Sequence, residues 1–145
     1  MNQSEKNSDA ITIRAIIAAP VDQVWDFWIE PKHITKWCSA SEEWHAPKAE
    51  NDLKKGGKFL TRMEAKDGSF GFDFGGIYTQ VEKHTRIDYV LDDGRQVGIQ
   101  FLKLDNGTEI VQCFDPEQEN SREMQKQGWQ SILDNFKKYA EHNRM

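Results

Sequence analysis

The spacing of apolar residues predicts one strand and two short helices in the first part of the chain. Apolar and polar positions alternate over residues 11–17, the period of two that is typical of a strand, and Pro20 ends this segment. Apolar residues then recur at helical spacing over residues 21–28, directly after a proline that suits the start of a helix. Pro31 begins a second short helix, predicted over residues 31–37.

The middle of the chain has the pattern of a succession of strands separated by turns. Asp93-Gly94 and Asn106-Gly107 are strong hairpin signals between such segments. Gly75-Gly76 falls inside one of them and predicts a bulge or a bend. The predicted strands cover residues 44–46, 58–65, 72–81, 86–91, 96–104 and 109–114.

The last segment changes to a helical period. Asn120 and Glu123 have the spacing of a capping box, with Ser121 as the alternative cap. One face of the predicted helix then carries the apolar residues Met124, Gly128, Trp129, Ile132, Leu133, Phe136 and Ala140, and polar residues, Gln125 among them, occupy the opposite face. The whole pattern predicts an α+β fold in which a curved antiparallel sheet wraps around one long C-terminal helix. A sheet of this shape leaves space beneath a helix such as the one predicted over residues 120–142.

Length and composition predict one domain and exclude several classes of protein. The chain has 145 residues, and we expect a disordered lead-in over residues 1–9 and a single domain over residues 10–145. The longest apolar run, residues 15–19, is far shorter than the roughly 20 residues of a membrane span. A net charge of −5, with the cations scattered, predicts no nucleic-acid partner. The polar N-terminus lacks a secretory signal, so we expect a cytoplasmic protein.

The side chains that carry most catalytic and metal chemistry do not form a recognisable set. Cys38 and Cys113 belong to no metal-binding motif, and in a reducing compartment we expect buried free thiols. The histidines are His33, His45, His84 and His142. None of the four has metal-ligand spacing or a nucleophile identifiable from the sequence. We therefore predict no catalytic residues, no metal and no cofactor.

Short motifs along residues 10–140 carry a resemblance to a known family. They are Ala19-Pro20-Val21-Asp22-Gln23-Val24-Trp25, Pro31 with Trp37, Gly56-Gly57-Lys58-Phe59, Asp67-Gly68, Gly75-Gly76-Ile77-Tyr78, Arg86-Ile87, Gly107-Thr108 and Gly128-Trp129. In this order the chain resembles the bacterial proteins related to the C-terminal domain of the activator of Hsp90 ATPase, the AHSA1-like family of the START-like, Bet v 1-like (SRPBCC) superfamily. The resemblance implies the helix-grip fold. Because members of the superfamily include lipid carriers, hormone receptors, cyclases and proteins of unknown role, it implies much less about activity.

Two departures from the family pattern affect the expected function. Relatives commonly have a second aromatic residue after the tryptophan matched by Trp37, and Cys38 stands there in this chain. If that ring lines the ligand mouth in relatives, the mouth of this chain is wider or differently filled. The Hsp90 activator also has an N-terminal domain that contacts the chaperone, and nine polar residues cannot replace it.

The aromatic residues, 11% of the chain, have two interpretations. They fill a core, or some of them line a cavity for an apolar ligand, and the family resemblance favours a cavity. The candidate lining residues are Trp28, Trp37, Phe59, Phe74, Phe101, Gln112, Trp129, Ile132, Leu133 and Phe136. A hairpin turn centred on Asn106-Gly107 pairs Phe101 with Gln112 across two strands. Gln112 then either orients a polar atom of the ligand or bonds to backbone or a trapped water.

The main functional hypothesis is a domain that binds a small apolar molecule between the terminal helix and the sheet, as a monomer or homodimer. A second hypothesis is a protein-interaction module that contacts an Hsp90-type chaperone, regulates its ATPase and serves a stress response. A third is an enzyme of the cyclase or hydrolase kind. That enzyme needs a polar dyad in the pocket, for which the chain offers Gln112 and, more remotely, Arg62 or Asp73.

Overall fold

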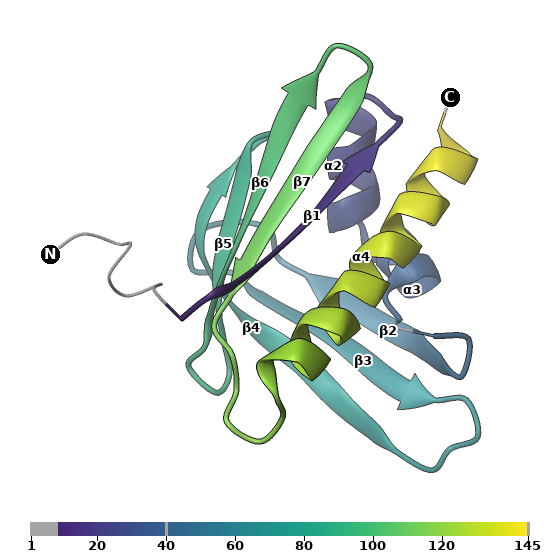
Figure 1. Ribbon diagram of the computed structural model, residues 1–145, viewed down its shortest axis with the longest axis vertical. Coiled ribbons are helices and arrows are strands. Elements are labelled where there is room, and N and C mark those ends of the chain that lie inside the picture. Colours follow the sequence, from purple (N-terminus) through teal and green to yellow (C-terminus); the bar gives the residue numbers. More distant parts are fainter. Residues whose placement is uncertain (1–8, 40, 145) are drawn as a thin grey trace, which may run out of the picture.

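In the computed structural model, which describes residues 9–39 and 41–144, one antiparallel sheet bends around a long helix (Figure 1). The sheet has seven strands in the order β1-β7-β6-β5-β4-β3-β2. The elements are β1 (Ile11–Ile17), α2 (Val21–Ile29), α3 (Pro31–Trp37), β2 (Trp44–Asn51), β3 (Lys58–Ala65), β4 (Gly71–Glu82), β5 (Arg86–Leu91), β6 (Gln96–Leu104), β7 (Gly107–Phe114) and α4 (Arg122–Asn143). The predicted α+β class, a curved sheet around a C-terminal helix with two short helices after the first strand, is confirmed. The expected disordered segment over residues 1–9 falls outside the described residues apart from Asp9.

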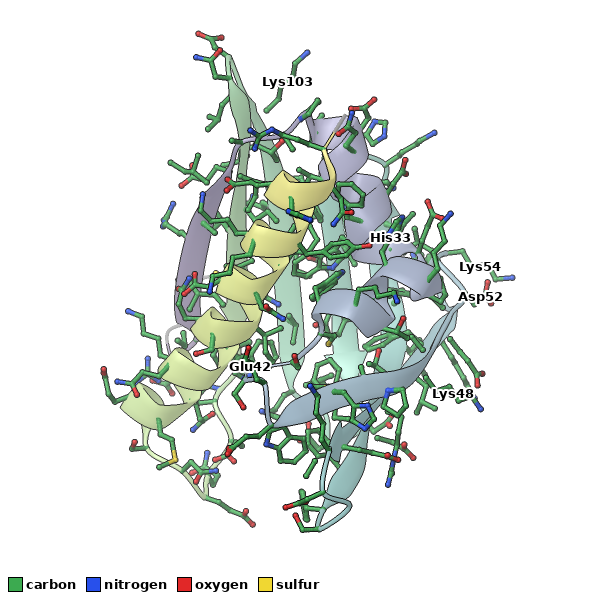
Figure 2. All side chains as sticks on the ribbon, turned by 90° about the vertical axis from the view of Figure 1, so that its right-hand side faces the viewer. His33, Glu42, Lys48, Asp52, Lys54 and Lys103 are labelled. Carbon is green, nitrogen blue, oxygen red and sulfur yellow. The ribbon has the colours of Figure 1, made fainter. Side chains whose placement is uncertain are left out.

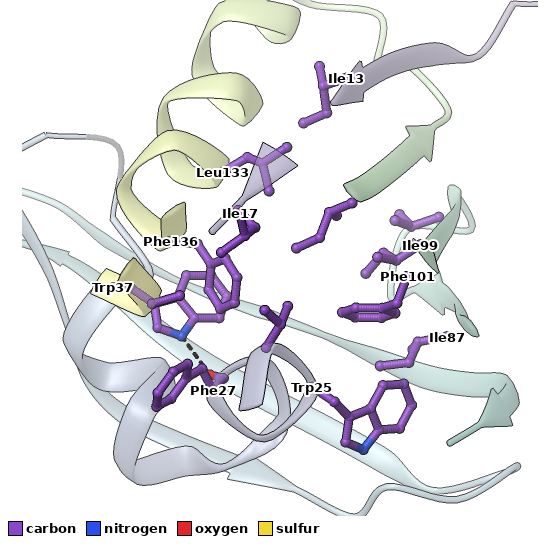
Figure 3. Close-up of a cluster of buried hydrophobic side chains, with 14 of the residues drawn as sticks. Ile13, Ile17, Trp25, Phe27, Trp37, Ile87, Ile99, Phe101, Leu133 and Phe136 are labelled. Carbon is purple, nitrogen blue, oxygen red and sulfur yellow. Dashed lines mark hydrogen bonds between the residues drawn. The ribbon is translucent and has the colours of Figure 1, made fainter. Parts of the chain in front are cut away.

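The inner face of the sheet, α2 and α4 enclose a well-packed core (Figure 3). Phe136 and Leu133 of α4 are at most 1% exposed, and Ile13 and Ile99 from the sheet are buried to the same degree. Each such side chain contributes about 1.5–3 kcal/mol by burial. The indole Nε1 of Trp37 donates a hydrogen bond of 2.9 Å to the carbonyl oxygen of Phe27, which fixes α3 against α2.

Polar side chains of α4 hold the helix to the free edge of β1. Gln130 Nε2 donates to the carbonyl oxygen of Arg14 at 3.1 Å, and Lys137 Nζ donates to that of Ile16 at 2.6 Å. These carbonyl groups lie on an edge strand and would otherwise be left to solvent. Gln130 and Lys137 therefore anchor the middle and the C-terminal part of α4 against β1.

The second edge strand, β2, is longer than the predicted segment 44–46. It runs from Trp44 to Asn51, with an irregularity between His45 and Lys48 where Pro47 interrupts the pairing with β3. The part of β2 after Pro47 lacks an alternation of apolar residues because Lys48 and Glu50 occupy it. Figure 2 shows Lys48 on this edge of the sheet. A proline and charges on an edge strand prevent pairing with another chain, and they also hide the strand from a pattern search.

The predicted pairing of β6 with β7 is wrong by two residues. Leu104 pairs with Gly107, so Phe101 faces Ile110 and Ile99 faces Gln112. Neither Asn106 nor Gly107, both within the described residues, has the positive φ that a turn centred on them requires. Gly107 instead lets β7 approach β1, since a Cβ there would lie 2.3 Å from the carbonyl oxygen of Ile17. A shift of two residues leaves every side chain on its predicted face.

The start of α4 uses the alternative cap. Ser121 is the N-cap residue, and its Oγ accepts a hydrogen bond of 3.1 Å from the Met124 backbone nitrogen. The capping box predicted from Asn120 and Glu123 does not form, because the Asn120 side chain bonds to Glu117 in the preceding segment.

Candidate functional site

A cavity of about 370 Å³ lies between the N-terminal half of α4 and the inner face of the sheet. Two rows of residues on α4 cover it, Met124, Gly128 and Ile132 in one and Gln125, Trp129 and Leu133 in the other. Residues four apart lie one above the other on a helix, so the two rows form a single face. The space predicted beneath this helix is present.

Strands from both halves of the sheet, together with α2 and α3, form the rest of the wall. It consists of Trp28, Ile34, Trp37, Cys38, Phe59, Thr61, Met63, Phe72, Phe74, Tyr78, Tyr89 and Gln112. Gly76 follows Phe74 on the same face of β4, and a Cβ there would lie 2.3 Å from the carbonyl oxygen of Val90. Glycine at this position lets β4 and β5 approach closely where the sheet curves under the cavity.

The structure places eight of the ten candidate lining residues at the cavity: Trp28, Trp37, Phe59, Phe74, Gln112, Trp129, Ile132 and Leu133. The other two, Phe101 and Phe136, lie in the core instead, 2% and 0% exposed. The Phe101 ring packs edge-on against Trp25 at 5.2 Å, and the Phe136 ring packs between Trp28 and Trp37 at 4.9 Å from each. Both rings pack against tryptophans of α2, and neighbouring side chains cover them almost completely.

Several lining residues were not among the candidates, although the sequence contained signals for some of them. Thr61 and Met63 share the parity of Phe59, and Phe72 shares that of Phe74, so strand alternation could have found them. Gln125, assigned from the sequence to the polar face of the helix, is buried in the structure. Arg95 and Glu117 lie in connecting segments without a periodic pattern, and no sequence signal marks them.

The mouth of the cavity has an apolar and a polar side. Phe72 and Met124, which are 41% and 60% exposed, form the apolar side. Arg95, Glu117 and Asn120 form the polar side, between the β5–β6 turn and the segment that joins β7 to α4.

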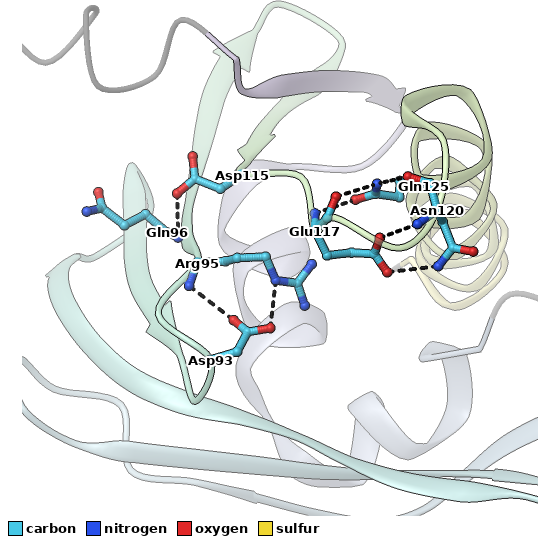
Figure 4. Close-up of polar contacts among 7 residues, drawn as sticks. All are labelled: Asp93, Arg95, Gln96, Asp115, Glu117, Asn120 and Gln125. Carbon is cyan, nitrogen blue, oxygen red and sulfur yellow. Dashed lines mark hydrogen bonds and ion pairs between the residues drawn. The ribbon is translucent and has the colours of Figure 1, made fainter.

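A hydrogen-bond network fixes the polar side of the mouth (Figure 4). Arg95 Nε donates to Asp93 Oδ2 at 2.8 Å. Gln125 ties the connecting segment to α4, because its Oε1 accepts from the Glu117 backbone nitrogen at 2.8 Å and its Nε2 donates to the Glu117 and Asn120 carbonyl oxygens. Asn120 donates from its backbone nitrogen and from Nδ2 to the two carboxylate oxygens of Glu117. The bonds from Asn120, and to a smaller extent the Glu119 backbone and the charge of Arg95, lower the pKa of Glu117.

The polar groups deeper in the cavity are uncharged. Burial raises the pKa of Tyr89 far above its ordinary value, so its hydroxyl stays protonated, and Gln112 lies nearby on the same wall. Burial also raises the pKa of Tyr78, whose hydroxyl donates to Asn51 Oδ1 at 2.5 Å. Burial raises the pKa of the Cys38 thiol to about 12, and its Sγ lies 3.8 Å from Met63 Sδ. A thiol of this kind is neutral at physiological pH and a poor nucleophile.

The residues considered for catalysis do not meet in the cavity. Arg62 and Asp73 pair with each other at 3.3 Å and are not among the lining residues. His33 Nδ1 lies 2.6 Å from the Tyr139 hydroxyl, between α3 and α4 (Figure 2), and His45 lies 3.8 Å from Glu64. Within residues 9–39 and 41–144, no group of three or more His, Cys, Asp or Glu side chains could hold a metal ion.

Two larger hollows, of about 620 and 560 Å³, have a different character. The first lies over the outer face of the sheet around Gly98, with Arg86 and Asp88 on its wall. The second is lined mainly by polar side chains of α3, α4, β2 and the segment between α3 and β2, among them Lys36, Glu42 and Asp134. Water already solvates such groups, whereas a cavity with apolar walls gains most from an apolar occupant. None of the helices in the described part of the chain is long and apolar enough to cross a membrane.

Comparisons with known proteins agree on one family. The family model described as Activator of Hsp90 ATPase homolog 1-like protein matches residues 18–141. The chain is similar to an AHSA1-like protein from Aeromonas hydrophila, with 45% identity, a TM-score of 0.87 and coverage of 92% of each chain. It is similar to a protein from Cytophaga hutchinsonii, with 52% identity, a TM-score of 0.81 and coverage of 93% of this chain and 94% of that one. A protein from Chromobacterium violaceum, with 22% identity, a TM-score of 0.82 and coverage of 92% of this chain and 98% of that one, shares the fold. No curated protein matches the chain.

Proposed function

Because the chain belongs to the Activator of Hsp90 ATPase homolog 1-like family, as its sequence motifs predicted, and has an apolar cavity under α4, we propose that it binds a small, largely apolar molecule in that cavity. The occupant lies between the face of α4 that carries Trp129 and the strand residues Phe59 and Phe74. The protein acts as a carrier or receptor for this molecule, and we expect it to work in the cytoplasm.

One observation supports the proposal above all others: the aromatic and aliphatic wall encloses a space that the chain's own side chains do not fill. Protein interiors pack as densely as organic crystals, and an unfilled volume of about 370 Å³ is far beyond an ordinary packing defect. It lies within the roughly 300–1,000 Å³ of small-molecule sites. The core a few residues further along α4, at Phe136, is closely packed, so the cavity is a local feature of the wall.

The rings of the wall are held in place, as a binding site requires. Trp129 stacks on Phe114 with 3.9 Å between centroids and 8° between planes. Phe74 packs edge-on against Trp129 at 6.0 Å. Rings fixed by their neighbours lose little conformational entropy when a ligand packs against them.

The experiment combines mass spectrometry with a variant that fills the cavity. Protein purified without added ligand is analysed by native mass spectrometry for a retained molecule, and the neutral dye Nile red serves as a reporter of the empty site. Gly128→Leu adds a side chain at a lining position where a Cβ meets no atom within 4 Å, and so reduces the space in the cavity. Gln127→Leu adds the same side chain on the solvent face of the same helical turn and is the matched control.

We expect saturable dye binding by the parent chain and by Gln127→Leu, and at least a tenfold loss of dye affinity in Gly128→Leu. A retained molecule should disappear in the same variant. Equal dye binding by all three proteins would contradict the proposal, because the dye would then bind outside the cavity.

The other two hypotheses stay predictions with their own tests. Regulation of an Hsp90-type ATPase requires that the purified chain change the ATPase rate of the host chaperone. An enzyme of the cyclase or hydrolase kind requires a dyad of polar groups, and the polar pair that the cavity holds at depth is Tyr89 with Gln112.

A further inference from the structure

Among the polar side chains that line the cavity, Tyr89, Arg95 and Gln112 lie together at one end. We call these three residues the polar end. All three line the cavity, and Arg95 and Gln112 both lie close enough to Tyr89 to influence its ionisation. An occupant of the cavity therefore meets aromatic and aliphatic side chains over most of its surface and hydrogen-bonding groups at one end.

The polar end holds hydrogen-bond donors that the chain itself does not use. A guanidinium has five N–H groups, and the side-chain bond of Arg95 within the described residues is the one from Nε to Asp93. The neighbouring polar groups already have hydrogen-bond partners within the chain. Both carboxylate oxygens of Glu117 accept from Asn120, and both the Oε1 and the Nε2 of Gln125 are hydrogen-bonded. The Nη groups of Arg95 are thus available to an acceptor on the ligand.

The charges around Arg95 determine which acceptor fits. Figure 4 shows its side chain directed between Asp93 on one side and Glu117 on the other. Asp93 is paired with it at 2.8 Å, and Glu117 is near enough for Arg95 to favour its ionised form. One positive charge therefore stands between two negative ones. A carboxylate ligand would bring a third negative charge to this group, which is unfavourable where water is partly excluded.

Resting on the proposed function, we propose that the molecule in the cavity carries an uncharged carbonyl group, that of a ketone, an ester or an amide, which accepts hydrogen bonds from Arg95 beside Tyr89 and Gln112. The apolar part of the molecule lies between α4 and strands β3 and β4. Arg95 is accordingly the residue that selects for the polar group of the ligand.

Three probes with the same number of carbon atoms test this assignment on the parent chain: decane, methyl octyl ketone and decanoate, each competing with Nile red at neutral pH. The ketone should bind about tenfold tighter than decane, as expected for hydrogen bonds from a charged donor. Decanoate should bind more weakly than the ketone by a similar factor. This comparison needs no variant and does not depend on the folding of one.

Two variants then assign the effect to named residues. Arg95→Met should abolish the difference in affinity between the ketone and decane. Arg86→Met is its matched control, because Arg86 also pairs with an acid two residues away, with Nε 3.0 Å from both oxygens of Asp88, but lies outside the cavity. Glu117→Gln removes one negative charge, so it should raise the affinity for decanoate relative to the affinity for the ketone.

The outcomes separate this proposal from the one it rests on. A ketone that binds no better than decane, or decanoate as the tightest of the three, overturns the carbonyl assignment while leaving an apolar site in place. Failure of decane and the ketone alike to displace the dye overturns the proposed function as well. Loss of the ketone preference in Arg86→Met to the same extent as in Arg95→Met would also refute the role of Arg95.

Discussion

The same substitution at two glycines is expected to change stability in opposite directions. Gly76 lies in β4, where a Cβ would be 2.3 Å from the carbonyl oxygen and 3.0 Å from the carbonyl carbon of Val90. Gly128 lies in α4 over the cavity, where a Cβ meets no atom within 4 Å. Alanine at each position therefore tests the close approach of two strands and the open space under the helix.

The magnitudes follow from these surroundings. Gly128→Ala removes backbone freedom that the unfolded chain has and the helix does not, and should raise the free energy of unfolding by about 0.5–1 kcal/mol. Gly76→Ala brings a methyl group against backbone atoms that cannot rotate away, so β4 and β5 must separate. We expect it to lower the free energy of unfolding by about 1–3 kcal/mol, the usual cost of overpacking.

Urea unfolding followed by tryptophan fluorescence measures both effects, with thermal unfolding as a second readout. For a domain of this size, 1 kcal/mol corresponds to a shift in Tm of roughly 3 °C. A destabilised Gly128→Ala would refute the open space beneath α4. An unchanged Gly76→Ala would refute the close approach of the two strands.

Three further predictions concern single side chains. Trp37→Phe removes the buried hydrogen bond to Phe27 and should lower the free energy of unfolding by about 1–3 kcal/mol in the same urea assay, with an unchanged value contradicting the bond. Burial raises the pKa of Cys38 from 9.0 to about 12, so the folded chain keeps a proton that the unfolded chain loses, and stability should fall as pH rises across that interval. Cys38→Ala should lack this component of the alkaline decline, and identical pH profiles for the two proteins would refute it. Gln125→Leu removes the three hydrogen bonds by which Gln125 ties the preceding segment to α4, so Nile red should exchange faster by stopped-flow fluorescence, and an unchanged rate would exclude a role of this contact at the mouth.

The sequence was informative where one face of an element is buried and the other is solvated. The predicted strands 58–65, 86–91 and 96–104 have the bounds of β3, β5 and β6, because apolar side chains alternate cleanly along them. The same rule failed for β2, where an edge position and Pro47 remove the alternation. The turn signal at Asn106-Gly107 gave the wrong β6–β7 pairing, since Gly107 is required for contact between strands rather than for a turn.

The cavity could be predicted only in part, for a related reason. Periodicity shows which face of an element points inward, but it does not show whether the space in front of that face is filled. Trp129 and Phe136 therefore look equivalent on the helix, yet the first borders the cavity and the second is fully buried. Arg95 reaches the cavity from a turn, where no period exists, so its part in the site depends on three-dimensional contacts alone.

The arrangement of β1 and α4 has a consequence for how the protein reaches its native state. β1 pairs with β7 from Ile11 opposite Phe114 to Ile17 opposite Thr108, and α4 follows both in the chain. Contacts this distant in sequence form late and slowly. Until α4 docks, the aromatic inner face of the sheet stays open to water and to other chains, which favours aggregation. Docking of α4 therefore both covers this face and creates the cavity.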